Sequence, residues 1–569
     1  MTGRPAEGGG PAVRRWREAL PLYLVAVVVT ALILAPLAAP GYALRYDMVF
    51  VPRQPLSWDL VAPAQSLPRA VPMDALVSLV TQLVPGWVVQ RVALAGAVLF
   101  AAVGAGRLVP TERRAVQLVA AVAYAWTPYL AERLLIGQWG LLLAYAALPW
   151  LVRAALDLRA GRDGALARVV LLAAPAAITP TGGLIALATV LVLAADRARL
   201  RLSAVAVGGV ALLNAPWIVA ALVTGAGGTS DPAGVAAFAA RAENWAGPLV
   251  ALAGTGGIWN VQATPASRSG TPAPLATLVL VVLAVVGAGL LRRRLPAGAA
   301  VRLGVLAGGA YLLAALAVLP GGNTALSWAV AHVPGAGLLR DGQKFLAPYA
   351  LVLVVCAALG AERLVARIDR EVGGIVLAGL LLLPLAAMPD LAFGGAGRIS
   401  PVRYPADWQA VAERLPEDPG EILALPLTTY RAYPWNPGRV VLDPAPRYLP
   451  GTVLTDDTLV VDDVAVAGEN PRLREVRRVL AEGRPVSATG VRWVVVQHGT
   501  PSTVDPAVLA GLDLRYEGES LSLYRNPAAS GSPQRAGSGR WLVVLACGTA
   551  VLVVMAAAFS TLRRRATAW

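Results

Sequence analysis

Apolar runs of about 17–25 residues recur along this chain of 569 residues, and they limit its fold more than any other feature. Each run is long enough to cross the roughly 30 Å hydrocarbon core of a bilayer as an α-helix. Only 15% of the residues are charged, compared with about 25% in soluble globular proteins. Because a helix satisfies its own backbone hydrogen bonds in lipid, the sequence predicts a polytopic α-helical membrane protein.

Arginine clusters beside these runs predict the topology, because basic loops stay on the cytoplasmic side. One cluster at 14–17 precedes the first span, 19–40, and another at 563–565 follows the last span, 541–561. Both termini are therefore expected in the cytoplasm. The other clusters fall on the same side when the chain has about 11–12 spans. The first run is a full span without a small-residue cleavage site, so no signal peptide is expected.

Residues 165–196 are flanked by arginines at both ends but are too few for two full spans. We expect two short half-spans, broken at TPTGG (179–183), where Pro180 and the glycines stop a helix. Non-helical backbone at this depth is tolerated only inside protein or beside a water-filled cavity. The half-spans are therefore predicted to line a cavity.

Large outward segments remain once the spans are assigned. They are loops 41–87, 224–273 and 321–344 and the block 396–539. The first loop contains PMDALVSLVTQLVPGW (72–87), whose amphipathic spacing predicts a helix at the membrane interface. The chain is thus divided into a transmembrane module, 1–395, an outer domain, and a last span with a basic tail, 540–569.

The outer block reads as an extracytoplasmic α/β domain. Short β-rich runs are bounded by turn residues, and two runs have helical spacing with a proline near the start. The expected strands lie at 421–427, 438–444, 458–466, 491–498 and 521–527, and the expected helices at 405–415 and 470–483. A Gly/Ser/Pro-rich linker, 526–539, leads to the last span.

The net charge of +15 does not indicate nucleic-acid binding. The outer block carries 17 acidic residues and 15 arginines, so the positive excess lies in the short loops of the membrane module, as topology signals do. Cys356 and Cys547 lie in apolar runs, and His332 and His498 are the only histidines. These residues have no metal-ligand spacing and are not expected to form a disulfide framework.

Polar and aromatic residues gather in the predicted outer loops, at the ends of spans. The candidates are Asp47, Asp59, Glu132, Arg133, Gln138, Trp139, Glu243, Trp245, Trp259, Asn260, Arg340, Asp341, Gln343 and Lys344. A carboxylate there can accept a proton from a hydroxyl nucleophile. Cations can hold a phosphate whose lipid tail lies in the bilayer. Lys344 is the only lysine in the chain and faces outward, where topology does not explain it.

Simpler interpretations exist for several of these residues. They are an ion pair of Asp47 with Arg45 or Arg53, a solvated loop position for Asp59, a local pair of Glu132 with Arg133, an aromatic-belt position for Trp245 and Trp259, and a snorkelling anchor at Lys344.

The layout resembles the GT-C superfamily of polytopic glycosyltransferases, which use polyprenyl-phosphate sugars. That family has an acidic residue just after span one, which Asp47 matches, and a further acid in the second outer loop, for which Glu132 is the candidate. GQWGLLLAYAALPWLV and LLRDGQKFLAPYALVLVV look like segments of actinobacterial arabinofuranosyltransferase-like proteins. GVRWVVVQHG is similar to the outer domain of YfhO-like bacterial membrane proteins.

The resemblance implies an inverting glycosyltransferase at the outer face of the cytoplasmic membrane. It would transfer a sugar from a polyprenyl-phosphate donor to a cell-envelope glycan or lipid, with Asp47 as general base. Lys344 and Arg340 would stabilise the leaving phosphate, and Glu132 and Asp59 would orient the acceptor or hold a divalent cation, Mg or Mn. The remaining substrate-binding candidates are Gln138, Trp139, Trp245 and Trp259.

The chain departs from the family pattern at one point, since Asp47 has no acidic neighbour. Three alternatives therefore stay open. One is a non-catalytic GT-C-like accessory protein, another is a lipid or polysaccharide transporter, and the third is a structural assembly protein whose outer domain docks partners.

Overall fold

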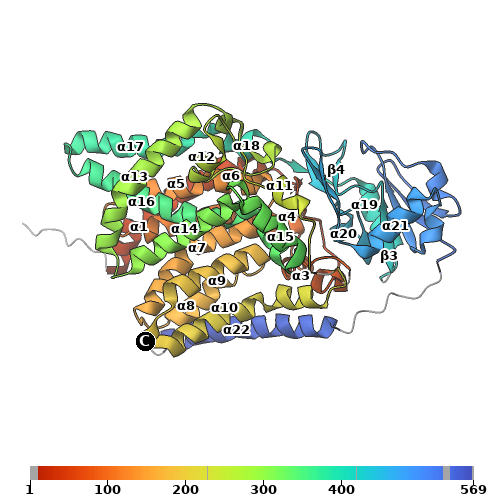
Figure 1. The fold of residues 1–569 in the computed structure, drawn as a ribbon, viewed down its shortest axis with the longest axis horizontal. Helices are drawn as coiled ribbons and strands as arrows, with labels where there is room; N and C mark the ends of the chain where they lie inside the picture. The colour runs from red at the N-terminus through yellow and green to blue at the C-terminus, as the bar shows by residue number, and fades with distance from the viewer. Residues whose placement is uncertain (1–10, 64, 227, 418, 530–538, 567–569) are drawn as a thin grey trace, which may run out of the picture.

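Helices build most of the molecule, and a β-rich region, residues 401–525, adjoins one end of the helical body (Figure 1). The computed structural model describes residues 11–566 apart from residues 64, 227, 418 and 530–538. Within that part, nine helices are long and apolar enough to cross a membrane. They are α1 (Pro11–Leu34), α4 (Gly86–Leu108), α7 (Trp139–Arg159), α10 (Leu200–Val223), α13 (Pro272–Arg294), α14 (Ala299–Ala315), α16 (Ala347–Val365), α17 (Arg370–Ala387) and α22 (Arg540–Ala566). The predicted polytopic helical fold is confirmed.

The expected half-spans are two short helices, α8 (Ala165–Ala173) and α9 (Pro180–Ala194). The Thr179 hydroxyl accepts a hydrogen bond from the backbone N–H of Gly182 at 3.3 Å and caps α9. Pro180 occupies the first helical position, where its missing N–H removes no helical bond. The break therefore lies at 174–179, just before most of the predicted segment, and Pro180 and the glycines begin α9 instead of stopping a helix.

The span expected at 115–131 is wrong in one respect, because it is interrupted. Helix α5 (Arg114–Ala125) ends before Trp126, and a separate short helix, α6 (Pro128–Leu135), follows. Thr127 has an extended backbone, as residues before proline prefer, and its hydroxyl accepts from the N–H of Leu130 at 3.1 Å. The interruption places Glu132 and Arg133 on a short helix of their own.

Small residues bring α13 and α16 close together. A Cβ atom added to Gly287 would overlap the carbonyl oxygen of Cys356, and one added to Gly360 would overlap that of Leu283. Glycines at such contacts let helices in a membrane approach each other closely. This packing holds α16, and with it the segment that carries Lys344, against its neighbour.

The β-rich region contains a five-stranded sheet in the order β10-β11-β9-β3-β6. Its strands are β3 (Glu421–Leu425), β6 (Thr452–Leu454), β9 (Trp493–Gln497), β10 (Asp513–Glu517) and β11 (Leu521–Arg525). Strand β3 is parallel to both β6 and β9, whereas β11 is antiparallel to β9 and β10. Helices α19 (Ala406–Arg414) and α21 (Pro471–Ala481) complete the predicted α/β character.

The run expected as one strand at 458–466 forms a separate hairpin instead. Its strands are β7 (Leu459–Val461) and β8 (Val464–Val466). Asp462 and Asp463 between them have positive φ angles of 45° and 68°, which turn the chain back on itself. The expected linker, 526–539, falls largely on residues 530–538, outside the described residues.

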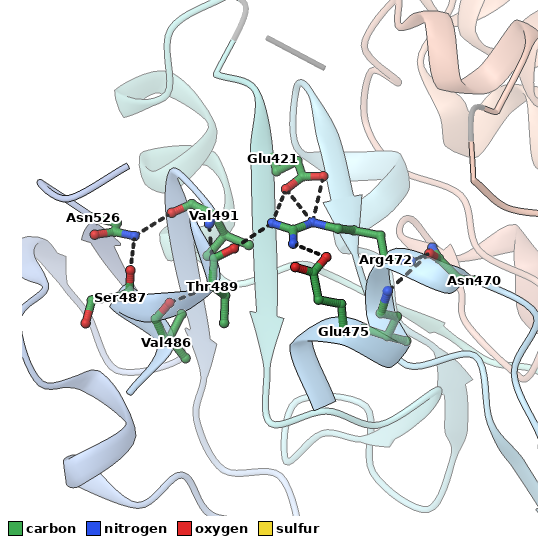
Figure 2. Close-up of polar contacts among 10 residues, drawn as sticks. Glu421, Asn470, Arg472, Glu475, Val486, Ser487, Thr489, Val491 and Asn526 are labelled. Carbon is green, nitrogen blue, oxygen red and sulfur yellow. Dashed lines mark hydrogen bonds and ion pairs between the residues drawn. The ribbon is translucent and has the colours of Figure 1, made fainter. Parts of the chain in front are cut away.

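Figure 2 shows how α21 is fixed to the sheet. The Asn470 side chain caps the helix by accepting from the N–H groups of Arg472 and Leu473. The Arg472 guanidinium donates to the Glu421 carboxylate at 2.9 Å and to the carbonyl oxygen of Thr489 at 2.8 Å. Because α21 is fixed at its cap and by a bidentate arginine, the positions of its other side chains are also fixed relative to the sheet.

Backbone pairing fastens the segment after α1 to the β-rich region. Strand β1 (Tyr42–Ala43) pairs antiparallel with β2 (Pro401–Val402). The N–H of Tyr46 donates to the carbonyl of Val440 at 2.7 Å, at the start of β5 (Val440–Leu442). Residues directly before Asp47 are thus held between the helical body and the β-rich region.

Candidate functional site

Asp47 lies in a tight turn that packs on the link between α6 and α7. Its backbone N–H donates to the carbonyl of Ile136 at 3.1 Å. Gly137 has a φ of +83°, and a Cβ atom there would overlap the backbone of Arg45 and Met48. Glycine is therefore required for this close approach, which brings Asp47 beside Gln138.

Two side chains orient the half-buried Asp47 carboxylate. The Tyr430 hydroxyl donates to Oδ1 at 2.6 Å, and the Gln138 amide donates to Oδ2 at 3.2 Å. Tyr430 begins β4 (Tyr430–Ala432) of the β-rich region. Burial and the Asp47 carboxylate raise the pKa of Tyr430 well above its usual value, so the phenol stays a donor at neutral pH.

The local ion pair considered for Asp47 does not form. The Arg45 guanidinium donates to the carbonyl oxygens of Leu135 and Gln262, at 2.9 and 2.7 Å. The Arg53 guanidinium donates to the Gln82 side chain at 2.6 Å.

A chain of contacts joins Asp47 to Lys344. Arg133 Nη1 donates to Gln138 Oε1 at 2.7 Å and to Asp341 Oδ2 at 3.4 Å. Lys344 Nζ lies 3.3 Å from the same Asp341 oxygen. We call these five residues the polar network: Asp47, Gln138, Arg133, Asp341 and Lys344. The Asp47 carboxylate and the Lys344 amine, both predicted to act in one active site, thus belong to one cluster.

The polar network is buried at its centre and open at Lys344. The Arg133 side chain is fully buried and that of Asp341 is 7% exposed, whereas that of Lys344 is 28% exposed. Burial raises the pKa of Asp341, but the charges of Arg133 and Lys344 outweigh it and hold this pKa below its usual value. The ionised carboxylate therefore lies between two cations.

Buried polar atoms without a partner concentrate here. Among the described residues, Arg133 Nε and Nη2 and Asp341 Oδ1 are buried and make no hydrogen bond within the protein. Most buried polar groups in folded proteins are paired, and unpaired ones often mark functional sites. Arg133 thus keeps two donors for another partner.

Glu132 belongs to a second buried cluster beside the polar network. It accepts from the Gln343 amide at 2.9 Å, and its neighbour Glu243 is paired with Arg268 at 2.7 Å. Burial and the Glu243 carboxylate raise the pKa of Glu132 well above its usual value. A protonated Glu132 can donate a hydrogen bond to the Glu243 carboxylate. The local pair with Arg133, considered as an alternative, is not formed, and Arg133 is paired with Asp341 instead.

Arg340 lies at the edge of the site. Its guanidinium is 3.4 Å from Glu469 of the β-rich region, which also pairs with Arg69. It stacks over the ring of Phe238 with 5.2 Å between the guanidinium carbon and the ring centroid. Burial lowers the pKa of Arg340, although it stays a cation at neutral pH. No contact of Arg340 with Asp47 is present in the described part of the chain.

The tryptophans divide into three cases. Trp259 joins the site, because its indole N–H donates to Asp341 at 3.4 Å. Trp139 is buried and packs on Phe50 with ring centroids 5.0 Å apart. Trp245 is 73% exposed and lies away from these contacts.

Asp59 is placed elsewhere. It accepts from the Thr452 hydroxyl and lies 3.6 Å from the guanidinium of Arg540, at the start of α22. Asp59 and Glu132, considered together for a divalent cation, thus have separate partners. Within the described residues, no group of three or more His, Cys, Asp or Glu side chains is placed to hold a metal ion.

Sequence reasoning missed Tyr430 and Arg268. Tyr430 bonds to a carboxylate 383 residues away, Arg268 pairs with Glu243 of its own loop, and neither stands in a motif. Their types offered no signal, since arginine and tyrosine occur throughout the segments between the predicted spans.

Solved structures of a mycobacterial protein, the arabinofuranosyltransferase AftD, share this fold. One matches with a TM-score of 0.57 and 17% identity, over 90% of this chain and 40% of that one. Two structures of an AftD mutant match at 18% identity with TM-scores of 0.56 and 0.53, over 91% and 89% of this chain and 42% and 41% of theirs. The chain thus spans about two fifths of the length of these neighbours. No family model matches the sequence, and no curated protein does.

The chain therefore shares the fold of these AftD structures, with long apolar helices and a β-rich region before the last long helix. At this level of identity the likeness concerns the fold alone. The similarity of GVRWVVVQHG to YfhO-like proteins stays a prediction.

Proposed function

We propose that this protein is a membrane glycosyltransferase that moves a sugar from a polyprenyl-phosphate donor to a cell-envelope glycan or lipid. The observation that carries the proposal is the polar network, which joins Asp47 to Lys344 through the half-buried Gln138 and the buried Arg133 and Asp341. The GT-C-like fold shared with a mycobacterial arabinofuranosyltransferase supports the same reaction class. Arabinofuranose is accordingly the first sugar to test.

Asp47 is proposed as the general base on the acceptor hydroxyl. Its carboxylate is held by Tyr430 and Gln138 but remains half-buried, so a substrate can reach it. The acceptor oxygen gives its proton to Asp47 and forms a bond to the anomeric carbon of the sugar. The bond from that carbon to the phosphate oxygen breaks, and its electron pair leaves with the phosphate. Attack opposite the leaving group inverts the anomeric carbon.

Lys344 and Arg133 are proposed to stabilise the leaving phosphate. Lys344 is the accessible cation, and Arg133 has two donors without a protein partner. Fixed cations aimed at a developing anion lower the barrier because they need no reorganisation during the reaction. Arg340, expected in this role, is engaged by Glu469, so we assign it to the contact with the β-rich region.

The membrane arrangement follows the arginine clusters. In the predicted topology, the arginine clusters and Asp47 lie at opposite ends of the spans. Because basic loops stay on the cytoplasmic side, this favours an outer location for the site and cytoplasmic termini. The helices α8 and α9 are proposed to line the path of the donor lipid, because their interrupted backbone requires a protein or water-filled environment.

The test uses purified protein in lipid nanodiscs with a panel of polyprenyl-phosphate sugars. We expect one donor to raise the thermal midpoint more than polyprenyl phosphate alone does, and to yield a glycosylated product with a matching acceptor. Folded protein that neither binds nor transfers any of these sugars would contradict the proposal and favour an accessory or transport role.

A further inference from the structure

The β-rich region contains a cavity of about 250 Å³ between the β7–β8 hairpin and α21. It is lined by Asp457, Thr458, Ala465, Ala467, Gly468, Arg474 and Arg477. Pockets for drug-sized ligands usually measure about 300–1,000 Å³. This cavity therefore suits a small polar ligand such as one sugar residue.

The cavity walls offer both hydrogen-bond donors and acceptors. The Thr458 hydroxyl is buried and has no partner among the described residues. Asp457 is fixed by the backbone N–H of Asn470, which donates to it at 2.8 Å, and packs so closely on Gly468 that a Cβ there would overlap its carboxylate. Sugar hydroxyls, which donate and accept at once, match such a mixture of carboxylate, hydroxyl and guanidinium groups.

The arginines of the cavity stand on a rigid element. Arg474 and Arg477 are three residues apart and share one face of α21. The same helix is held by Arg472 and by the Asn470 cap (Figure 2). Arg477 is paired with Asp456, whereas Arg474 donates a long hydrogen bond of 3.4 Å to the carbonyl of Gly468.

Two direct connections link this cavity to the candidate site. The Thr429 hydroxyl donates to the carbonyl of Thr458, and the next residue, Tyr430, donates to Asp47. Gly468 lines the cavity, and the next residue, Glu469, pairs with Arg340. Lining residues of the cavity are thus connected, through at most one intervening residue, to groups that contact the polar network or its edge.

We propose that this cavity binds a sugar residue of the acceptor glycan and so directs the acceptor hydroxyl toward Asp47. The inference rests on the proposed function, since it supplies the acceptor subsite of that transferase. It assigns the discrimination between acceptors to the β-rich region and leaves the donor to the membrane helices.

The test measures binding of three probes to the full chain in nanodiscs by saturation-transfer NMR. The probes are the methyl glycosides of an arabinofuranosyl, a galactosyl and a mannosyl disaccharide. Ala465→Trp fills the cavity, and Thr458→Val removes a hydroxyl that bonds to no protein group. We expect each variant to weaken the best probe at least tenfold. Arg478→Ala is the matched control, because this exposed arginine of the same helix does not line the cavity.

The outcomes separate this inference from the proposed function. Wild-type protein that transfers sugar while Ala465→Trp and Thr458→Val bind the probe as tightly as wild type overturns the acceptor subsite alone. Probe binding that both variants lose, in a protein without transferase activity, supports the subsite and contradicts the proposed reaction. Failure of wild type to bind any of the three probes overturns the inference.

Discussion

Replacing Asp47 with asparagine removes the proposed base with little change in shape. Asparagine keeps an oxygen that can accept from the Tyr430 hydroxyl, whereas its amide faces the donating amide of Gln138. The structural loss is thus one neutral-to-charged hydrogen bond at a half-buried position, about 1.5–3 kcal/mol at most. The catalytic loss is larger, because general-base catalysis contributes roughly 10²–10⁴-fold, or about 3–5 kcal/mol of barrier.

Single-turnover transfer in nanodiscs measures this effect separately from product release. We expect Asp47→Asn to lower the transfer rate at least 100-fold while donor-induced thermal stabilisation persists. Tyr430→Phe is the comparison, since it removes only the orienting hydroxyl at 2.6 Å, and a loss of about tenfold is expected. An Asp47→Asn variant that keeps more than a tenth of the wild-type rate would refute the role of this carboxylate.

Three further variants test the surroundings of the site. Lys344→Ala is expected to reduce transfer about 10–100-fold, less than loss of a buried cation would, because the side chain is 28% exposed and its amine also pairs with Asp341. Lys344→Arg should restore part of the rate, and equal rates in all three proteins would contradict a phosphate contact. Gly137→Ala should lower both the thermal midpoint and the transfer rate, since the φ of +83° and the contact with the Asp47 turn both oppose a side chain. Gly298→Ala is the control: its φ of +78° is similar, but the space around it is open, so the midpoint should fall only slightly. Glu132→Gln should remove a pH dependence of stability. The folded protein retains a proton on Glu132 that the unfolded chain releases above about pH 4.5, so the wild type loses stability as the pH rises from there and the variant gains relative to it. Parallel curves of thermal midpoint against pH for the two proteins would show that Glu132 is ionised in the folded state.

The fold was largely predictable because its strongest signals are local. Long apolar runs, the proline after Thr179 and the β-rich runs at 421–427 and 491–498 each act within a few residues. The interruption at Thr127 was missed because apolar residues continue across it, although Thr-Pro is a helix-start signal. The turn at Asp462–Asp463 was missed because the flanking valines resemble one continuous strand.

The candidate site was only partly predictable, because its contacts join distant segments. Asp47, Gln138 and Lys344 stand out by type and by their place at span ends, and the structure brings them into one network. Tyr430 contacts Asp47 across 383 residues, which no periodicity or spacing can indicate. Asp59 lies in the same loop as Asp47 but faces Thr452 and Arg540, since position in one loop does not fix which partner a side chain meets.

The chain's single lysine allows a direct measurement of phosphate contact. Reductive methylation with ¹³C-formaldehyde labels one side chain, Lys344, besides the α-amine. On titration with polyprenyl phosphate in nanodiscs, we expect the ¹³C resonance of Lys344 to shift and to saturate together with the thermal stabilisation, because the phosphate lies beside this amine. A resonance that stays unchanged while the lipid phosphate saturates the protein would show that the carrier binds elsewhere.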